Sequence, residues 1–562
     1  MSQRLETATG VQAARNAGAK DLYDVAIVGY GPGGEVLAST LGAAGVRVIV
    51  VERWPQPYPL PRLTSLDGEA CRVVQATGIG IDEAFDDAVD LPQAYFVDAA
   101  GDHLMVVNYP GKLGGWPSRV SIFQPDFERA VADKVATMPN VELLRGWEAK
   151  AIVQTDEQVA LSIEPFSRDG AQSPSEARVI RAKYLVGTDG ARSFVRSAME
   201  IPIRDFNLHE RWLNFDADIL RELPERFKEL RIYMDPQRPH MFMPIGKRRL
   251  RLEFRVMEGE TDEAMVKPEA AWAFLGGEPY GLGEDDIKIM RHVVYHYHTR
   301  IISQWRKGRV FLGGDAAHTM PPYMGQGGCS AMRDGRNLGW KLVEVLTGRS
   351  DAALLDTYGP EREPHMRTIA MASDRLSRVV NIMDPAHAAK RDAGMRGQKE
   401  ALPPELPGLV TGVLHHDADG NVANGAGLFT PQGRLHRDGV EALGDEFLGS
   451  GFQLWCRKDP ANDLSSYARK VLDRLGCTLG VFDDVASRHA FDDTEGVYLS
   501  FLDQLDADVA LVRPDFYLFG AVKASELNDL ISELAERLHS KGLDASAAAS
   551  VTAMAFTDRE GA

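Results

Sequence analysis

Three glycine-rich stretches, far apart in the chain, carry the residue types that hold a nucleotide. They read GYGPGG at residues 29–34, GTDG at 187–190 and GGDAAH at 313–318. Glycine lets a backbone approach a phosphate closely, and free N–H groups at a helix N-terminus attract its negative charge. Together the three stretches predict a binding site for one extended nucleotide cofactor.

The first stretch lies in the order of strand, turn and helix that a dinucleotide fingerprint requires. Gly29 permits the turn, Gly31 lets the backbone approach a pyrophosphate, and Gly34 allows close packing of helix against strand. The next apolar run ends at Glu52, whose carboxylate is placed to accept hydrogen bonds from an unphosphorylated ribose. An NAD-dependent dehydrogenase or a structural glycine turn would also carry this stretch, but neither accounts for the other two.

The composition is ordinary for a globular protein of several domains. The 562 residues allow three or four domains, with 44% hydrophobic and 26% charged residues. A net charge of −18 disfavours nucleic acid as a partner, and no apolar run is long enough to span a membrane. Residues 1–22 lack the apolar core of a secretory signal. The four widely spaced cysteines show no metal-binding or C-x-x-C spacing, so we expect buried thiols, a cytoplasmic location and no metal site.

Between residues 203 and 300 the pattern changes to that of antiparallel strands, which indicates an inserted sheet domain. In residues 249–256 apolar side chains alternate with arginines and a glutamate, which predicts a half-buried strand. We expect its arginine-bearing face to be solvated, and binding of a substrate carboxylate is the alternative. A proline-rich linker at 402–408 marks a domain boundary, and short strands alternate with helices beyond it.

The order of these motifs and the residues around them resemble the class A flavoprotein aromatic hydroxylases, and within them the 3-(3-hydroxyphenyl)propionate hydroxylase type. The resemblance covers roughly residues 23–455. It rests on the three glycine-rich stretches and on Glu52, PLPR at 59–62, QP at 124–125, ARSFVR at 191–196, PPYMGQGGCS at 321–330 and RD at 333–334.

The resemblance implies an α/β fold with a Rossmann-like, glutathione-reductase-type FAD-binding domain, an inserted antiparallel β-sheet substrate domain and a C-terminal thioredoxin-like domain. The expected parts are a flexible tail at 1–22, the FAD-binding domain at 23–95, 119–200 and 300–365, the substrate domain at 96–118 and 201–299, a helical segment and linker at 366–405, and the last domain at 406–562. Without C-x-x-C that domain cannot carry out dithiol chemistry, so its expected role is packing or homodimer formation.

The resemblance also implies FAD, with NADH or NADPH as co-substrate. Because the chain has only one dinucleotide fingerprint, the nicotinamide cofactor should bind transiently. The expected cofactor-binding residues are Gly29, Gly31, Gly34, Glu52, Arg53, Arg62, Gln124, Asp189, Asp315, Pro322, Gly325, Gly327 and Gly328. Among them, Asp315 is expected to hold the ribityl chain. The loop at 321–328 is poor in side chains and leads into a helix, whose N-terminus stabilises negative charge on a reduced flavin.

The implied reaction is NAD(P)H-dependent insertion of one oxygen atom from O2 into a phenolic or related heteroaromatic ring, through a flavin C4a-hydroperoxide. A base or a chain of hydrogen bonds should deprotonate the phenol. Candidates facing the flavin from the inserted sheet are Asn214, Tyr233 and His240, and candidates beside its ring are Pro322, Tyr323 and Ser65. Ser65 stands where the resembled subgroup usually has a histidine, so the substrate or the route of deprotonation should differ. A flavoprotein of another type, such as a Baeyer–Villiger-like oxygenase or a double-bond reductase, and a non-catalytic flavin-fold scaffold are the alternatives.

Overall fold

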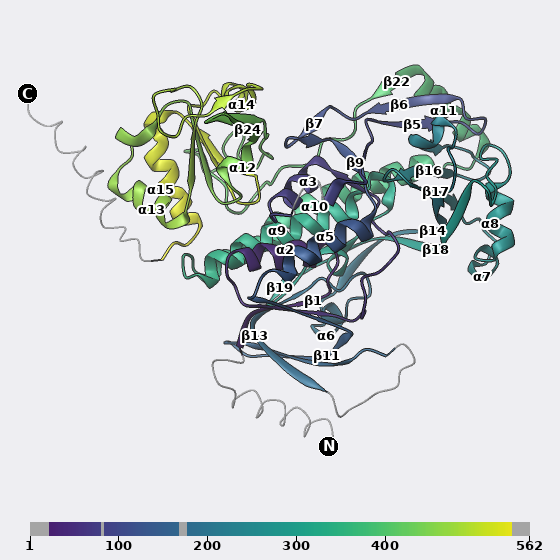
Figure 1. Cartoon of the computed structure of the whole chain (residues 1–562), viewed down its shortest axis with the longest axis horizontal. Helices are drawn as coiled ribbons and strands as arrows, with labels where there is room; N and C mark the ends of the chain where they lie inside the picture. Colours follow the sequence, from purple (N-terminus) through teal and green to yellow (C-terminus); the bar gives the residue numbers. More distant parts are fainter. Residues whose placement is uncertain (1–21, 80–83, 168–176, 542–562) are drawn as a thin grey trace, which may run out of the picture. The chain divides into compact units, whose positions relative to one another are not determined.

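The computed structural model describes residues 22–79, 84–167 and 177–541, and it divides into two compact units (Figure 1). The first unit contains the residues up to 336 together with 366–406, and the second contains 337–365 together with the residues from 407 onward. The expected flexible tail lies, except for its last residue, outside the described residues.

An eight-stranded sheet in the first unit carries the first glycine stretch at the end of its strand β1. The order is β10-β2-β1-β13-β12-β11, and β13 also pairs with β20, which pairs with β19. Strand β1 is parallel to both neighbours, and Val25 and Ile27 are fully buried, as the apolar run before the glycines predicts. The strands are β1 (Leu22–Val28), β2 (Val48–Glu52), β10 (Val141–Arg145), β11 (Trp147–Gln154), β12 (Val159–Pro165), β13 (Arg178–Gly187), β19 (Arg306–Lys307) and β20 (Val310–Leu312).

Helices α2 and α5 pack together beside this sheet, and α9 lies next to α2 (Figure 1). Helix α5 begins with a proline in its first turn, and Asp126 is the first-turn acid that the sequence predicts. Helix α9 ends at Leu346, and Gly348, with a φ of +74°, follows as the predicted stop. The helices described here are α2 (Pro32–Ala43), α3 (Gly68–Gln75), α5 (Gln124–Ala136), α6 (Phe194–Ala198), α7 (Asp262–Met265), α8 (Pro268–Leu275), α9 (Gln326–Leu346), α10 (Tyr358–Val380) and α11 (Pro385–Gln398).

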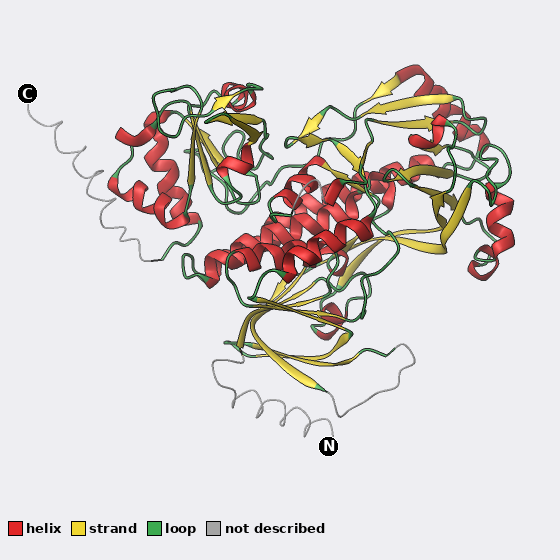
Figure 2. Ribbon diagram, in the orientation of Figure 1, coloured by secondary structure: helices red, strands yellow, loops and turns green. Residues whose placement is uncertain are grey.

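A nine-stranded sheet, with the order β21-β18-β14-β17-β16-β15-β5-β6-β22, forms the other large layer of the first unit (Figure 2). Its strands are β5 (Gln93–Val97), β6 (His103–Asn108), β14 (Ile203–Ile219), β15 (Leu230–Tyr233), β16 (His240–Ile245), β17 (Arg249–Arg255), β18 (Ile287–Ile302), β21 (His318–Thr319) and β22 (Lys399–Ala401). Smaller sheets join β3 (Ser65–Asp67), β9 (Arg119–Ser121) and β4 (Val89–Asp90), and pair β7 (Lys112–Leu113) with β8 (Trp116–Pro117).

The register of the nine-stranded sheet sorts its side chains onto two faces. Asn214 on β14 lies opposite Glu253 on β17 and Val293 on β18, and alternate residues point the same way. We call the front face the side that carries Glu210, Trp212, Asn214, Asp216, Arg251, Glu253, Arg255, Arg291, Val293, Tyr295 and Tyr297. The opposite side is the back face, where an apolar core packs with residues of α7 and α8.

The expected half-buried strand at 249–256 is buried on both faces. Leu250, Leu252 and Phe254 lie in the core of the back face, and Arg251 on the front face is only 5% exposed. The prediction of a solvated arginine face is therefore wrong. The reason is tertiary: residues 61–65, which we call the strap, cover this part of the sheet and bind Arg251.

The second unit is built on a four-stranded sheet with the order β26-β25-β28-β29. Strands β25 and β26 are parallel and joined through α13, whereas β28 and β29 form an antiparallel pair followed by α15. Its elements are α12 (Gly444–Leu448), α13 (Ser466–Leu475), α14 (Val497–Gln504), α15 (Leu527–Arg537), β25 (Gln453–Cys456), β26 (Thr478–Val481), β28 (Val509–Val512), β29 (Leu518–Val522) and a small sheet of β23 (Arg434–Arg437), β24 (Val440–Leu443) and β27 (Asp492–Asp493). This confirms the alternation of strands and helices predicted beyond the linker.

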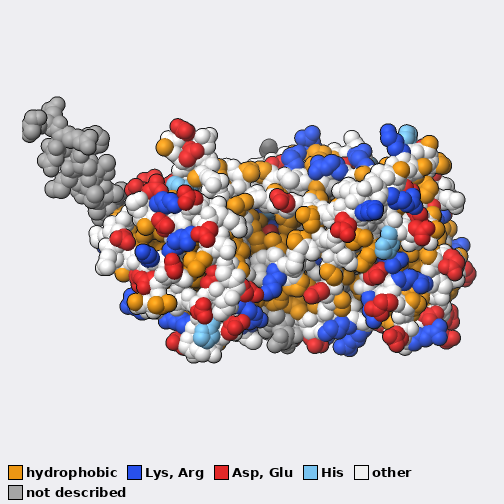
Figure 3. Space-filling model, turned by 90° about the horizontal axis from the view of Figure 1, so that it is seen from above, with side chains coloured by type: hydrophobic (Ala, Val, Ile, Leu, Met, Phe, Trp, Pro, Cys, Tyr) orange, Lys and Arg blue, Asp and Glu red, His pale blue; other side chains and the backbone are white. Residues whose placement is uncertain are grey.

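The surface carries charges of both signs. Figure 3 shows acidic and basic side chains interspersed over the face in view, with scattered hydrophobic side chains between them. No helix within the described ranges combines the length and the hydropathy of a membrane-spanning segment.

Candidate active site

The turn after β1 forms a cradle with one open position. Gly29 has a φ of +97°, and a Cβ there would lie 2.5 Å from the carbonyl oxygen of Thr188. A Cβ at Gly34 would lie 2.4 Å from the carbonyl oxygen of Gly29. At Gly31, by contrast, a Cβ would meet no described atom within 4 Å. The backbone at Gly31, which precedes the first turn of α2, therefore borders open space where a phosphate can approach.

Glu52 lies at the end of β2, beside this cradle. Its carboxylate accepts hydrogen bonds from the backbone N–H groups of Tyr30 and Trp54, both at 2.9 Å. These two bonds fix the side chain against the glycine turn, and each oxygen keeps a lone pair for another donor. Arg53, the next residue, is exposed, and its guanidinium lies 5.4 Å from the centroid of the Trp54 ring.

The second stretch, residues 187–190, contacts the glycine turn after β1. The Thr188 hydroxyl donates to the Gly29 carbonyl at 2.8 Å. Asp189 accepts hydrogen bonds from the Ser193 hydroxyl and, at 3.0 Å, from the Val195 N–H. Val195 lies in the first turn of helix α6. Burial raises the pKa of Asp189, and these hydrogen bonds oppose the rise. In the structure the carboxylate of Asp189 is thus committed to the start of α6.

The third stretch forms a short 3-10 turn, η4 (Gly314–Ala316), after β20. Asp315 is exposed, whereas Gly314 and Ala316 are buried. Neighbouring atoms of the chain reduce the hydration of its carboxylate and so raise the pKa of Asp315, and the charges of His318 and Arg62 oppose the rise. Asp315 is therefore reachable from solvent and shares its surroundings with Arg62 of the strap.

Asp334 on α9 holds this turn in place, although it is not among the expected site residues. Its Oδ2 accepts hydrogen bonds from the Gly314 N–H at 2.9 Å and from the His318 Nε2 at 2.7 Å. On the other side, Arg196 donates to the Ala316 carbonyl at 2.9 Å. The sequence does contain a hint, because the RD pair at 333–334 follows the glycine loop at helical spacing.

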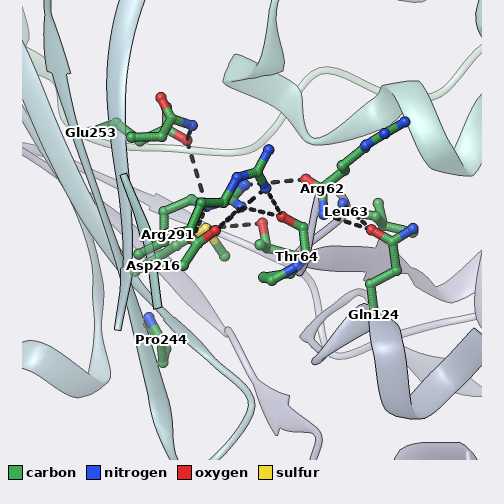
Figure 4. A network of polar contacts seen from close by, with 12 residues as sticks. Arg62, Leu63, Thr64, Gln124, Asp216, Pro244, Glu253 and Arg291 are labelled. Atoms are coloured by element: carbon green, nitrogen blue, oxygen red, sulfur yellow. Dashed lines mark hydrogen bonds and ion pairs between the residues drawn. The ribbon is translucent and has the colours of Figure 1, made fainter. Parts of the chain in front are cut away.

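Gln124 fixes the strap through its side-chain oxygen. Gln124 Oε1 accepts hydrogen bonds from the N–H groups of Arg62 and Leu63, both at 2.7 Å (Figure 4). The Arg62 guanidinium lies 4.7 Å from the centroid of the Tyr58 ring. Of the two expected cofactor contacts, Arg62 is exposed, whereas Gln124 is buried and acts on the position of the strap.

The loop at 321–328 forms the 3-10 turn η5 (Pro322–Met324) and then enters α9. Gly325 has a φ of +64°, and a Cβ there would lie 2.4 Å from Arg119 Nη2. Arg119 donates to the Met324 carbonyl and to the Ser65 hydroxyl, both at 3.1 Å. The Ser65 side chain is therefore occupied by Arg119, which the sequence reasoning missed. The exposed Pro322 accepts the Gly325 N–H at 2.7 Å through its carbonyl.

The two glycines that follow have different surroundings. A Cβ at Gly328 would lie 2.7 Å from the Leu63 side chain, so this glycine permits close contact with the strap. A Cβ at Gly327 would meet no described atom within 4 Å. The backbone at Gly327, in the first turn of α9, thus borders open space, and the N-terminus of a helix there can stabilise negative charge on a ligand.

Tyr323 is tied to the front face of the nine-stranded sheet. Its hydroxyl donates to Glu210 Oε2 at 2.8 Å and accepts a hydrogen bond from Asn381 Nδ2 at 2.6 Å. Glu210 also accepts hydrogen bonds from the Trp212 indole and the Ser377 hydroxyl. Burial and the neighbouring Glu210 raise the pKa of Tyr323 well above its ordinary value. The carboxylate of Glu210 therefore joins the loop, β14 and α10.

The three substrate candidates from the sheet do not share a face. Asn214 lies on the front face, whereas Tyr233 and His240 pair with each other on the back face and stack with ring centroids 4.3 Å apart. Burial lowers the pKa of His240. The expectation that all three face the flavin is wrong for Tyr233 and His240, because the strand register turns them into the aromatic core.

The centre of the front face holds a buried polar network (Figure 4). Arg251 binds Asp216 through two hydrogen bonds of 2.7 and 3.0 Å, and it also donates to the carbonyls of Pro61 and Arg62 at 2.8 and 3.1 Å. Arg291 donates to the same Pro61 carbonyl. The two arginines thus bind the strap to the sheet, which places the strap above the front face.

One group of side chains in the described part of the chain is close enough to share a cation: Asp205, His209 and His298. Several of their polar atoms are already paired within the protein. The two histidine Nδ1 atoms lie 2.7 Å apart, and Asp205 accepts from Arg300 at 2.7 Å and from the Asn207 N–H at 2.9 Å. Cys71, Cys329 and Cys456 are buried free thiols, and Cys477 is half-buried.

These residues fit FAD. Gly31 and Gly327 are two backbone positions where a Cβ would enter open space, one at the N-terminus of α2 and the other in the first turn of α9. Asp315 is an accessible carboxylate in the third stretch. A pyrophosphate matches the N-terminus of α2 at Gly31, and a chain of hydroxyls matches the carboxylate of Asp315. The negatively charged edge of a reduced flavin ring matches the first turn of α9 at Gly327.

Comparison with known proteins identifies the family. A family model described as the FAD binding domain matches residues 22–373, and a model described as the HcaD C-terminal domain matches residues 427–537. The probable NADH-specific resorcinol 4-hydroxylase of Rhodococcus jostii (strain RHA1) is 34% identical, over 91% of this chain and 94% of the relative. The 3-(3-hydroxy-phenyl)propionate/3-hydroxycinnamic acid hydroxylase of Mycobacterium sp. (strain KMS) is 32% identical, over 92% and 91%.

Solved structures agree on the fold. The flavin-dependent monooxygenase PieE, crystallised with FAD and substrate, superposes with a TM-score of 0.75 at 22% identity and covers 92% of this chain and 99% of its own. Aklavinone-11 hydroxylase gives a TM-score of 0.72 at 24% identity, with the same coverage. The resemblance drawn from the motifs and the prediction of FAD are confirmed. The chain belongs to the class A flavoprotein aromatic hydroxylases, which are FAD-dependent enzymes.

Proposed function

We propose that this enzyme hydroxylates a small phenol of the resorcinol type with NADH or NADPH as reductant. One observation carries the proposal: the polar front face of the sheet is bound both to the strap, through Arg251, and to the loop before α9, through Glu210. A small ring lying on that face would therefore be next to both segments that border the FAD site. The names of the two relatives support a phenolic substrate.

The protein's own residues would divide the cofactor between them. The N-terminus of α2 at Gly31 would receive the pyrophosphate, Glu52 the ribose, and Asp315 the ribityl hydroxyls. The first turn of α9 at Gly327 would stabilise negative charge on the ring edge of the flavin. The chemistry that bound FAD supplies is the passage of reducing equivalents from NAD(P)H to O2, with one oxygen atom going to the ring.

We further propose the domain division expected from the sequence, with residues 406–562 as a thioredoxin-like domain. The strand order β26-β25-β28-β29, with a parallel pair joined by α13 and an antiparallel pair followed by α15, supports this assignment. The second unit differs from that domain in one respect, because it also contains residues 337–365, which the sequence assigns to the FAD-binding domain. A role in homodimer formation remains part of the proposal. Three buried and one half-buried free cysteine support a reducing, cytoplasmic setting.

The test uses the FAD-loaded full-length protein. NADH and NADPH oxidation is measured with resorcinol, 3-(3-hydroxyphenyl)propionate and other phenols, under dioxygen labelled with oxygen-18. We expect at least one phenol to accelerate reductant oxidation and to gain one labelled oxygen atom on its ring. Oxidation that no phenol accelerates, or a product without the label, would contradict the proposal.

A further inference from the structure

We propose that Glu253 is the base that takes the proton from the phenolic hydroxyl of the substrate, with Asn214 holding its carboxylate. The inference rests on the proposed function and names the residue responsible for one step of it. Both residues lie on the front face, directly opposite each other in the register of β14 and β17.

Their position on the face is central. Along β14 the front-face residues are Glu210, Trp212, Asn214 and Asp216. Glu210 at one end is bound to Tyr323 of the loop, and Asp216 at the other end is bound, through Arg251, to the strap. Asn214 and its partner Glu253 therefore lie between the two segments that border the FAD site.

This part of the face is also short of hydrogen-bond partners. In the described part of the chain, a single hydrogen bond reaches the carboxylate of Glu253, from Asn214 Nδ2 at 2.8 Å, and Arg251 Nε lies 3.8 Å from the same carboxylate. The other polar atom of that amide, Asn214 Oδ1, is buried and has no partner among the described residues. The same is true of the Tyr295 hydroxyl on β18. Because buried polar groups are ordinarily satisfied, these two atoms leave hydrogen-bonding capacity on this face for a polar ligand.

Three side chains of the neighbouring strand are more exposed than Asn214 and Glu253. Val293, Tyr295 and Tyr297, which lie on the front face of β18, are only half-buried, although Asn214 and Glu253 beside them are 1% and 4% exposed. The rings of Tyr295 and Tyr297 are nearly parallel, with an interplanar angle of 6° and centroids 6.0 Å apart. An aromatic substrate can pack against such rings with its hydroxyl toward Glu253.

The charges around Glu253 suit a base. The charged and titratable groups that face it are Arg251 on its own strand, Asp216 on β14, and Arg291 and Tyr297 on β18. Burial raises the pKa of Glu253 to about 7, against the opposing effects of Arg251, Arg291 and the Asn214 hydrogen bond. A carboxyl with a pKa near neutrality can both accept and release a proton at physiological pH.

The proton transfer exchanges one O–H bond for another. The O–H bond of the phenol breaks, its electron pair stays on the phenolic oxygen, and the proton forms a bond to a carboxylate oxygen of Glu253. Before the step, Arg251 and Arg291 face two carboxylates, Asp216 and Glu253. After it, Glu253 is neutral, and the excess positive charge of the arginines favours the phenolate. Glu253 returns to its ionised form by giving the proton to water when the product leaves.

The experiment compares wild type, Glu253→Gln and Glu253→Asp, all loaded with FAD, with resorcinol as the probe. Turnover is measured from pH 6 to 10, and the ultraviolet difference spectrum of resorcinol bound to the oxidised enzyme reports phenolate. In wild type, turnover and phenolate should rise through about pH 7. In Glu253→Gln, turnover at pH 7.5 should fall about 10²- to 10⁴-fold, and it should recover toward pH ~10, where a phenol ionises by itself. Glu253→Asp should restore part of the neutral-pH turnover.

Two further variants separate this role from a structural one. Glu258→Gln changes an exposed carboxylate five residues away and should leave the profile unchanged. Asn214→Ala removes the hydrogen bond that lowers the pKa of Glu253, so the rise in turnover should move to higher pH. If Glu253→Gln or Asn214→Ala folds and keeps the wild-type profile and phenolate spectrum, Glu253 is not the base. If wild type itself oxidises no reductant with any phenol, the proposed function fails, and this inference fails with it.

Discussion

Two buried glutamates in different units of the molecule have opposite surroundings. In the second unit Glu361, which is 0% exposed, accepts hydrogen bonds of 2.7 to 3.1 Å from the side chains of Asn337, Lys341 and Arg513 and from the Val413 N–H. In the first unit Glu253, 4% exposed, accepts its hydrogen bond from Asn214. Both side chains are almost completely hidden from water, and they differ in how many hydrogen-bond donors the protein provides in its place.

The difference appears in their protonation. Burial by itself raises the pKa of either carboxyl, but the charges of Arg513 and Lys341 outweigh it at Glu361 and lower its pKa. At Glu253 burial prevails, and the pKa rises to about 7. A buried carboxylate surrounded by charged donors keeps its ionised form, whereas in one with few donors the ionised form is destabilised and the carboxylate is left able to take a proton.

The largest effect should come from removing the saturated carboxylate. Glu361→Gln leaves the charges of Arg513 and Lys341 buried with less compensation, so the second unit should lose about 3–5 kcal/mol of stability. Urea unfolding of the full chain, followed by tryptophan fluorescence, measures the loss. Glu446→Gln, which changes an exposed carboxylate of the same unit, is the control and should leave the transition in place. Equal midpoints for the two variants would show that the Glu361 network does not stabilise this unit.

Glu253→Gln should have the opposite effect on stability. Because its folded pKa lies above that of the unfolded chain, Glu253 favours folding at acid pH, and this contribution is lost as the pH rises through about 7. At pH 8.5 the glutamine variant should therefore be more stable than wild type by up to about 3 kcal/mol, and near pH 4 the two should be alike. Thermal unfolding at the two pH values tests this expectation, and a variant less stable than wild type at pH 8.5 would refute it.

The contrast between filled and open surroundings extends to glycines of the cofactor site. Gly31→Val adds a side chain where no described atom lies within 4 Å, so the fold should tolerate it, but the phosphate space should be filled. We expect FAD affinity to fall about tenfold or more, equivalent to about 1.4 kcal/mol. Flavin fluorescence during dialysis measures the affinity. Gly277→Val, at an equally open position with an ordinary φ, is the control and should keep FAD. Equal FAD affinity in both variants would remove Gly31 from the site.

The smallest loss of stability should come from a change in the Glu210 network, where several donors share one carboxylate. Tyr323→Phe removes one hydrogen bond from Glu210, which keeps those of Trp212, Ser377 and Asn381. We expect a loss of about 1 kcal/mol and a small decrease in melting temperature, with FAD retained. A loss as large as that of Glu361→Gln would mean that Glu210 depends on this one donor, contrary to the comparison.

The motifs predicted the glycine turn after β1 because its parts are local. Gly29, Gly31 and Gly34 act through the backbone of a single turn, and their spacing shows this without knowledge of the rest of the chain. Helix α9 and its stop at Gly348 were predictable for the same reason. Arg119 and Asp334 were not predicted, because each forms hydrogen bonds with a segment that is distant in the sequence.

The front face could be predicted only in part. Alternation in residues 249–256 shows that Arg251 and Glu253 share a face, but it does not show that the strap covers that face. Tyr233 and His240 have the chemistry of substrate contacts, and only the pairing of β15 with β16 turns them into the core. The sequence does not predict the pairing of Glu361 with Arg513 either, because the two residues are 152 positions apart and meet only through tertiary packing.

The most direct test of the account is infrared difference spectroscopy of the oxidised, FAD-loaded enzyme at pH 8.5 before and after addition of resorcinol. Glu253 is then mostly ionised, so proton transfer from the phenol should produce a new carbonyl band of a neutral carboxylic acid. We expect this band in wild type and in Glu361→Gln, and we expect it to be absent in Glu253→Gln. A band that persists in Glu253→Gln, or bound resorcinol that ionises in wild type with no such band, would contradict it.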